Sequence, residues 1–123
     1  MSKNTNVELA ERGKNAAERF LYKKGLDILE RDWECEAGSV DIVARENDTL
    51  VFSEVKTRMD NGNGFPDDGI TEKKRNRLEK IALAYLAKLK EADLSVRFDQ
   101  ISIVVMGEDR AFIRHHIGAY SVM

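Results

Sequence analysis

Three side chains of complementary chemistry lie on two neighbouring stretches in which apolar and polar residues alternate. Asp41 belongs to residues 39–45, and Glu54 and Lys56 belong to residues 50–57. Two carboxylates and an ammonium group can hold a hard divalent cation and neutralise charge on a phosphate. We therefore take Asp41, Glu54 and Lys56 as candidate catalytic residues for phosphodiester hydrolysis.

The two stretches have the pattern of a β-hairpin with Asn47-Asp48 as its turn, because both residue types tolerate the positive φ of a tight turn. This turn would place Asp41 directly opposite Glu54, and Ser39 opposite Lys56. Opposed residues have Cβ atoms about 4.5–5.5 Å apart, a separation at which like charges repel. A cation between Asp41 and Glu54 would offset that repulsion.

Glu54 and Lys56 share one face of their strand, since side chains alternate along it. Mg²⁺ or Mn²⁺, as one or two ions, suits this face because such ions take one or two carboxylates and complete their shell with water. The Val55 carbonyl is a candidate additional ligand, and Lys56 would hold the attacking water or neutralise charge on the phosphate. An ordinary surface ion-pair ladder has the same spacing, so the pattern alone leaves both interpretations open.

The rest of the chain predicts elements that would support this hairpin. A capping box that begins at Thr5 opens a helix over residues 7–24, and Thr71 can cap a second helix over residues 71–91. The predicted strands cover residues 26–36, 39–45, 50–57, 96–106 and 111–117. The order is helix, three strands, helix and one or two strands, which is typical of an α/β sandwich with helices flanking a mixed central sheet.

Length and composition indicate one ordinary domain. The chain has 123 residues, of which 42% are apolar and 34% charged. We expect a single domain over residues 1–123, with a flexible loop at residues 58–70 and a short C-terminal tail at residues 118–123. No apolar run approaches the roughly 20 residues of a membrane span, and the N-terminus lacks a secretory signal. With Cys35 as the only cysteine, these features predict a cytoplasmic protein that does not enter a membrane.

Nucleic-acid binding would need a local basic patch, because the formal net charge of the chain is −2. Residues 71–80 supply such a patch at the start of the second predicted helix. Cations in a first turn oppose the helix dipole, so helix stability does not explain them. A solvated helix end is the alternative interpretation. The candidate phosphate contacts are Arg58, Lys73, Lys74, Arg77 and Lys80.

The sequence resembles the restriction-endonuclease-like superfamily, whose signature is an Asp followed later by Glu or Asp, any residue, and Lys. More narrowly, it resembles the small bacterial YraN-like family. The matching stretches are Gly13 with Ala17, Phe20 and Leu21; residues 38–44; residues 50–58; Lys74 with Arg77 and Leu78; residues 84–86; and residues 97–99. The resemblance implies a restriction-endonuclease-like fold and metal-dependent endonuclease activity. It also implies DNA rather than RNA as the partner, including branched forms.

Two positions depart from the family pattern. Lys14 and Ser39 stand where the family has glutamates. Because Lys14 brings a cation to a metal site, the second hypothesis is a non-catalytic nucleic-acid-binding or scaffold protein that retains the fold. Glu18, one helical turn beyond Lys14, is a candidate replacement ligand. A homodimer would suit the cleavage of a junction, although no apolar face in the sequence identifies its interface.

Other chemically reactive side chains have simpler interpretations. Asp99 is predicted to be a structural acid that pairs with Arg97 or a nearby cation. His115 and His116 are predicted to be incidental, because neighbouring residues of a strand point to opposite faces and cannot easily share one metal. Trp33 is predicted to pack in the core or at an edge.

Overall fold

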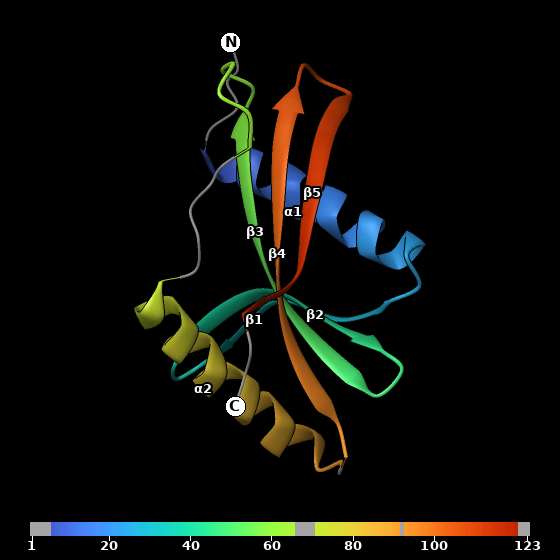
Figure 1. Ribbon diagram of the computed structural model, residues 1–123, viewed down its shortest axis with the longest axis vertical. Helices are drawn as coiled ribbons and strands as arrows, with labels where there is room; N and C mark the ends of the chain where they lie inside the picture. The colour runs from blue at the N-terminus through green and yellow to red at the C-terminus, as the bar shows by residue number, and fades with distance from the viewer. Residues whose placement is uncertain (1–5, 66–70, 92, 121–123) are drawn as a thin grey trace.

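Five strands form one mixed sheet, and a helix packs on each of its faces (Figure 1). This computed structural model describes residues 6–65, 71–91 and 93–120. The helices are α1 (Asn6–Lys23) and α2 (Glu72–Leu89). The strands are β1 (Asp27–Cys35), β2 (Gly38–Glu46), β3 (Thr49–Met59), β4 (Ser95–Met106) and β5 (Arg110–Tyr120).

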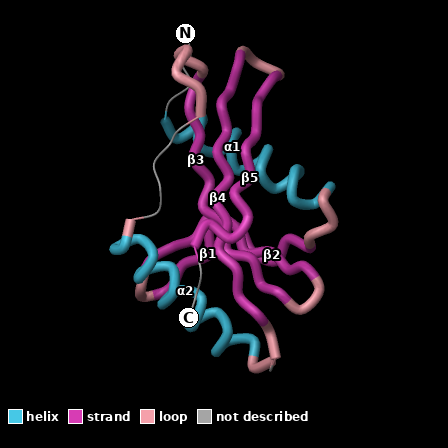
Figure 2. Tube along the Cα trace, in the orientation of Figure 1, coloured by secondary structure: helices cyan, strands magenta, loops and turns pink. Residues whose placement is uncertain are grey.

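The strands lie side by side in their chain order, β1-β2-β3-β4-β5. The pairs β1–β2, β2–β3 and β4–β5 are antiparallel, whereas β3 and β4 are parallel. A parallel pair needs a long crossover, and α2 lies in that connection (Figure 2). None of the described helices is long and apolar enough to cross a membrane.

The predicted elements are all present, and α2 is followed by two strands rather than one. Local signals set several of their ends. The Thr71 hydroxyl accepts a hydrogen bond from the Lys74 amide at 3.2 Å, which caps α2. Gly25 adopts φ +97° just after α1, a conformation that favours glycine. The other predicted cap residue, Thr5, lies outside the described residues.

Two strands extend into segments that the sequence predicts as a loop and a tail. Arg58 and Met59 belong to β3 rather than to a loop, because they pair with Val104 and Val105 of β4. Residues 118–120 extend β5 rather than beginning a tail. Hydrogen bonds to β4 keep the ends of β3 and β5 extended. The local sequence of each strand end does not show that this pairing will form. Residues 66–70 and 121–123 of the predicted loop and tail lie outside the described residues.

Alternation along β3 separates two apolar cores. Val51 packs into the cluster beneath α1, whereas Leu50 and Phe52 pack into the cluster beneath α2. Glu54 and Lys56 continue the face of Leu50 and Phe52. Both side chains therefore leave the sheet on the side that α2 covers.

Helix α1 approaches β3 very closely at Gly13. A Cβ atom built at Gly13 would lie 1.7 Å from the Thr57 Oγ1 atom, so only glycine allows the helix to pack this near the strand. Thr57 directly follows Lys56, and Lys14 directly follows Gly13. The close approach therefore brings the Lys14 side chain to the region of the candidate catalytic residues.

Candidate functional site

The β2–β3 hairpin brings Asp41 and Glu54 together, in the register that the sequence predicts. Its ladder ends where Ile42 pairs with Ser53, and Asp41 and Glu54 are the next residues along the two strands. At this point the Asp41 Oδ2 atom accepts a hydrogen bond from the Val55 amide at 2.7 Å. The Asp41 carboxylate thus replaces a main-chain carbonyl of β2 as the hydrogen-bond acceptor for the Val55 amide of β3.

The second predicted pair, Ser39 with Lys56, is wrong. The β2–β3 ladder does not reach Ser39, which pairs instead with Glu34 of β1. Residues 38–40 of β2 stay paired with β1 but no longer pair with β3, so the two strands of the hairpin separate there. The resulting gap in the ladder is the position at which both carboxylates lie.

Helix α2 surrounds Glu54 with positive charge. The Arg77 Nη2 atom lies 3.2 Å from the Glu54 Oε1 atom, and the Lys74 Nζ atom lies 3.6 Å from the same oxygen. Glu54 is only 8% exposed, so salt screens these pairs less than it screens surface pairs. Lys74 and Arg77, which the sequence predicts as phosphate contacts, also neutralise the buried acid.

Arg77 also contacts the start of β2. Its Nη1 atom donates a hydrogen bond to the Ser39 carbonyl at 2.9 Å. Gly38 has φ +137°, and a Cβ atom there would lie 3.2 Å from the Arg77 Cδ atom. Glycine therefore supplies both the backbone conformation and the space for Arg77, a physical reason for the Gly-x-x-Asp stretch that ends in Asp41.

Burial raises the pKa of both carboxyl groups. For Asp41, burial has the largest effect on the pKa, and the Val55 amide and the Lys14 charge oppose it. For Glu54, burial again comes first and the Asp41 charge adds to it, while Lys74 and Arg77 lower the pKa. Neighbouring acids with raised pKa values in a partly buried position are typical of functional sites.

A further cation reaches the site from α1. The Lys14 Nζ atom lies 2.7 Å from the Asp32 Oδ1 atom of β1. The pKa of Lys14 is raised, first by this hydrogen bond and, after opposition from burial, by the charges of Asp32 and Asp41. Sequence reasoning missed Asp32. Its φ of 52° follows a β-bulge between Ile28 and Glu30, and a bulge redirects side chains without a reliable local signal.

The two lysines beside Glu54 affect each other. Burial lowers the pKa of Lys74, and the nearby Lys56 charge lowers it further, whereas Glu54 raises it. Lys56 itself is partly buried on β3. With Arg77, these lysines outnumber the two carboxylates, so the site as it stands is suited to an additional negative group such as a phosphate.

Four of the five predicted phosphate contacts line a single groove. The groove has a volume of about 570 Å³ and lies along the first turns of α2, with Ala37 on its β1–β2 side. Its basic residues are Lys73, Lys74, Arg77 and Lys80. Because Lys74 and Arg77 also contact Glu54, the groove leads directly to the acid pair. We call it the α2 groove.

Two other predicted site residues have different partners. Arg58 donates hydrogen bonds to the Gly64 carbonyl, within the loop that follows β3. The Glu18 Oε1 atom lies 3.4 Å from the Arg31 Nη1 atom. Among the described contacts, Glu18 therefore belongs to a surface ion pair with β1 and does not join the acid pair.

Asp99 is a structural acid, as predicted, but His115 is not incidental. The Asp99 carboxylate accepts hydrogen bonds from Arg97 at 2.9 and 3.0 Å. The His115 Nε2 atom lies 2.7 Å from Asp99 Oδ2, and the Gly118 amide donates to Oδ1 at 3.0 Å. Asp99 therefore ties β5 to β4, a role that only the pairing of the two strands reveals.

The fold and site define a class of protein: a mixed α/β domain with one buried and one half-buried carboxylate on neighbouring strands, bordered by lysine and arginine side chains. The model of the uncharacterised protein family UPF0102 matches residues 13–103. The chain belongs to this family, which agrees with its YraN-like resemblance. The matched region contains the acid pair and the α2 groove, and it excludes β5.

Relatives from several bacteria cover most of the chain. A UPF0102 protein of Geobacter sulfurreducens is 38% identical over 117 residues, which are 95% of this chain and 91% of the relative. One from Geotalea daltonii is 43% identical and covers 83% of this chain and 80% of its own. One from Nocardia farcinica is 37% identical, with 87% and 84% covered.

Proposed function

We propose that this protein is a metal-dependent endonuclease that hydrolyses phosphodiester bonds of DNA and has a restriction-endonuclease-like fold. The observation that carries the proposal is the pair of adjacent carboxylates, half-buried Asp41 and buried Glu54, beside the basic α2 groove. Burial destabilises a charged carboxylate, and two adjacent carboxylates also repel each other. A cation that binds between Asp41 and Glu54 would therefore stabilise their charged forms. The groove supplies charge for a polyanionic substrate at the same place.

The two carboxylates have the oxygens that a divalent cation would need. Among the described residues, contacts to Asp41 use Oδ2 and contacts to Glu54 use Oε1. The described part of the chain holds no group of three or more His, Cys, Asp or Glu side chains suited to a metal. This donor set fits Mg²⁺ or Mn²⁺, which bind through one or two carboxylates and keep several waters. Asp41 and Glu54 would hold the ion, with the Val55 carbonyl as a further ligand.

The bound ion would supply Lewis-acid chemistry and an activated water. The remaining steps belong to side chains of this protein. Lys73 and Lys80 would bind backbone phosphates along the α2 groove, and Lys74 and Arg77 would hold the phosphate nearest to Glu54. Lys56 would stabilise the negative charge that develops on the reacting phosphate.

A second candidate function is nucleic-acid binding without cleavage. It is favoured by the cations that already neutralise the acid pair: the Lys14 charge acts on Asp41, and Lys74 and Arg77 contact Glu54. Each of them opposes the entry of a metal ion. A protein of this kind would keep the α2 groove for phosphates and serve as a scaffold on nucleic acid.

Calorimetric titration of Mn²⁺ separates the two functions. For the endonuclease, we expect binding to the wild type, loss of binding in Asp41→Asn and Glu54→Gln, and unchanged binding in the control Asp93→Asn. Asp93 is an exposed acid between α2 and β4. Cleavage is then assayed on single-stranded, duplex and junction DNA, and on matching RNA. The variants that lose Mn²⁺ binding should also lose cleavage, and the nucleic acid that the wild type cleaves identifies the substrate.

The outcomes discriminate between the candidates. DNA binding without Mn²⁺ binding or cleavage would select the second function, and the absence of all three would contradict both. Cleavage of two strands at a junction requires two sites. For that substrate we also expect a homodimer, which analytical ultracentrifugation with and without junction DNA would detect.

A further inference from the structure

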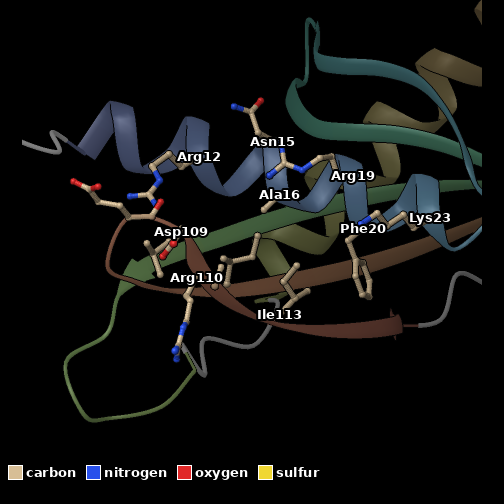
Figure 3. A pocket seen from close by; sticks show the side chains of 13 residues that line it. Arg12, Asn15, Ala16, Arg19, Phe20, Lys23, Asp109, Arg110 and Ile113 are labelled. Atoms are coloured by element: carbon tan, nitrogen blue, oxygen red, sulfur yellow. The ribbon is translucent and has the colours of Figure 1, made fainter.

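A second groove lies on the other side of the sheet, between α1 and the β4–β5 hairpin (Figure 3). It has a volume of about 420 Å³ and shares no lining residue with the α2 groove. We call it the α1 groove. Its floor is apolar and is formed by Ala16, Phe20, Ile103, Val105, Ala111 and Ile113. The acids Glu108 and Asp109 and the cation Arg110 line its other lip, so the basic side chains of the groove outnumber the acidic ones.

Three cations follow the edge of α1 that borders this groove. Arg12, Arg19 and Lys23 are seven and four residues apart, so they form one stripe with axial separations of about 10 and 6 Å. Figure 3 shows all three side chains along the groove, whereas Arg110, on the opposite lip, points away from the helix.

A contact of the Arg12 side chain connects the helix to the hairpin beside this groove. The Arg12 guanidinium donates to the main-chain carbonyls of Gly107 at 3.3 Å and Glu108 at 2.9 Å. These acceptors are neutral, so the Arg12 charge is not cancelled. Within the described residues, neither Arg19 nor Lys23 forms an ion pair. By contrast, Lys14 on the same helix pairs with Asp32.

We propose that the α1 groove binds a single-stranded segment of nucleic acid. The phosphates follow the row from Arg12 to Lys23, and an unpaired base or sugar covers the apolar floor. A strand carries one negative charge per nucleotide, which suits a row of several cations better than a single anionic group does. A duplex would satisfy the cations, but it keeps its bases stacked and paired, which leaves the apolar floor without a partner.

This inference rests on the proposed function only in taking nucleic acid as the ligand, and it narrows the substrate class. The α1 and α2 grooves lie on opposite faces of the sheet. A straight duplex in the α2 groove cannot reach the α1 groove, whereas an unpaired strand that leaves the duplex can bend around the sheet. The substrate is therefore DNA with an unpaired segment next to its duplex part.

The test measures the affinity of a fluorescent oligothymidine by anisotropy, in EDTA and over a range of salt concentrations. Each phosphate contact to a single strand contributes about −0.7 to the slope of log affinity against log salt. The double variant Arg19→Ala/Lys23→Ala should therefore reduce the slope by about 1.4. Lys90→Asn removes an exposed cation at the end of α2 that lines neither groove, and should leave the slope unchanged.

An unchanged slope in Arg19→Ala/Lys23→Ala, with the wild type still binding, would overturn this inference alone. Loss of affinity in Lys73→Ala/Lys80→Ala would then support the α2 groove and the proposed function. If the wild type bound duplex DNA but no oligothymidine, this inference alone would fail, and if it bound neither, the proposed function would fail as well. Thymidine monophosphate and an acidic apolar peptide serve as competitors. Each competitor is added at the same total concentration of negative charge as the oligothymidine. If either one displaced the oligothymidine from the α1 groove, the groove would not be specific for a single strand and the proposal would be overturned.

Discussion

The guanidinium of Arg77 on α2 lies 3.2 Å from the Glu54 Oε1 atom on β3. Its other terminal nitrogen donates to the Ser39 carbonyl of β2 at 2.9 Å. One side chain thus connects the helix to both strands of the candidate site. The site is complete only when α2 packs on the sheet, and a phosphate in the α2 groove would compete with Glu54 for Arg77.

Arg77→Gln should destabilise the fold by about 1–3 kcal/mol, because Glu54 stays buried and loses its closest cation. Urea unfolding at neutral pH measures this change. Arg75→Gln is the control, since the Arg75–Glu79 contact is longer, at 3.8 Å, and more exposed. In the Arg77→Gln background, Glu54→Gln should restore much of the loss. An equal loss in the Arg75 variant would show that Glu54 is not the cause.

Asp41→Asn should increase stability at pH 7. Burial raises the pKa of Asp41 in the folded state, so ionisation of Asp41 favours the unfolded state. This penalty develops as pH rises from the unfolded value of about 3.9 through the folded pKa, and it is absent below both. Asparagine keeps an acceptor for the Val55 amide. Urea unfolding of both proteins from pH 3 to pH 8 should show a gain that vanishes in acid, and Asp109→Asn should show no such gain.

Asp99→Asn should destabilise the fold by about 3 kcal/mol at pH 7, because Arg97 would lose its fully buried partner. Burial acts to raise the pKa of Asp99, but the hydrogen bonds from His115, Arg97 and Gly118 outweigh it and the pKa is lowered. The stabilisation is present above the unfolded pKa of about 3.9 and is lost as pH falls through the folded pKa. Thermal unfolding should therefore show the two proteins converging in acid. A constant difference at all pH values would contradict this assignment.

Lys14→Glu should strengthen Mn²⁺ binding several-fold. The substitution removes a cation whose charge acts on Asp41 and adds an acid next to Asp32. Isothermal titration calorimetry measures the affinity. Lys24→Glu makes the same change in net charge beyond the end of α1 and should have little effect. Equal gains in both variants would assign the effect to overall charge rather than to the site.

Gly13→Ala should destabilise the fold despite the helix preference of alanine, which by itself would favour the variant by about 1 kcal/mol. The new methyl group would overlap the Thr57 hydroxyl and force α1 away from β3. We expect a net loss of about 1–3 kcal/mol in urea unfolding. Arg19→Ala, at an exposed position of the same helix, should be neutral or stabilising. A stable Gly13→Ala protein would show that the close approach is not required.

The sequence by itself determined the elements whose signals are local. Asn47-Asp48 forms the predicted hairpin turn, with φ 55° at Asn47, and Thr71 caps α2. Because a two-residue turn fixes the register of a hairpin, the position of Asp41 next to Glu54 followed directly. These features depend on interactions between residues close together in the chain, so a short stretch of sequence is enough to predict them.

The tertiary structure alone decided which charges meet. Arg77 with Glu54, Lys14 with Asp32, and His115 with Asp99 are each separated by at least sixteen residues, and each depends on how an element packs or pairs. Electrostatic contacts act through space, so sequence spacing does not reveal their partners. Glu18 illustrates this, since helical spacing places it near Lys14, whereas its contact with Arg31 arises only when α1 packs against β1.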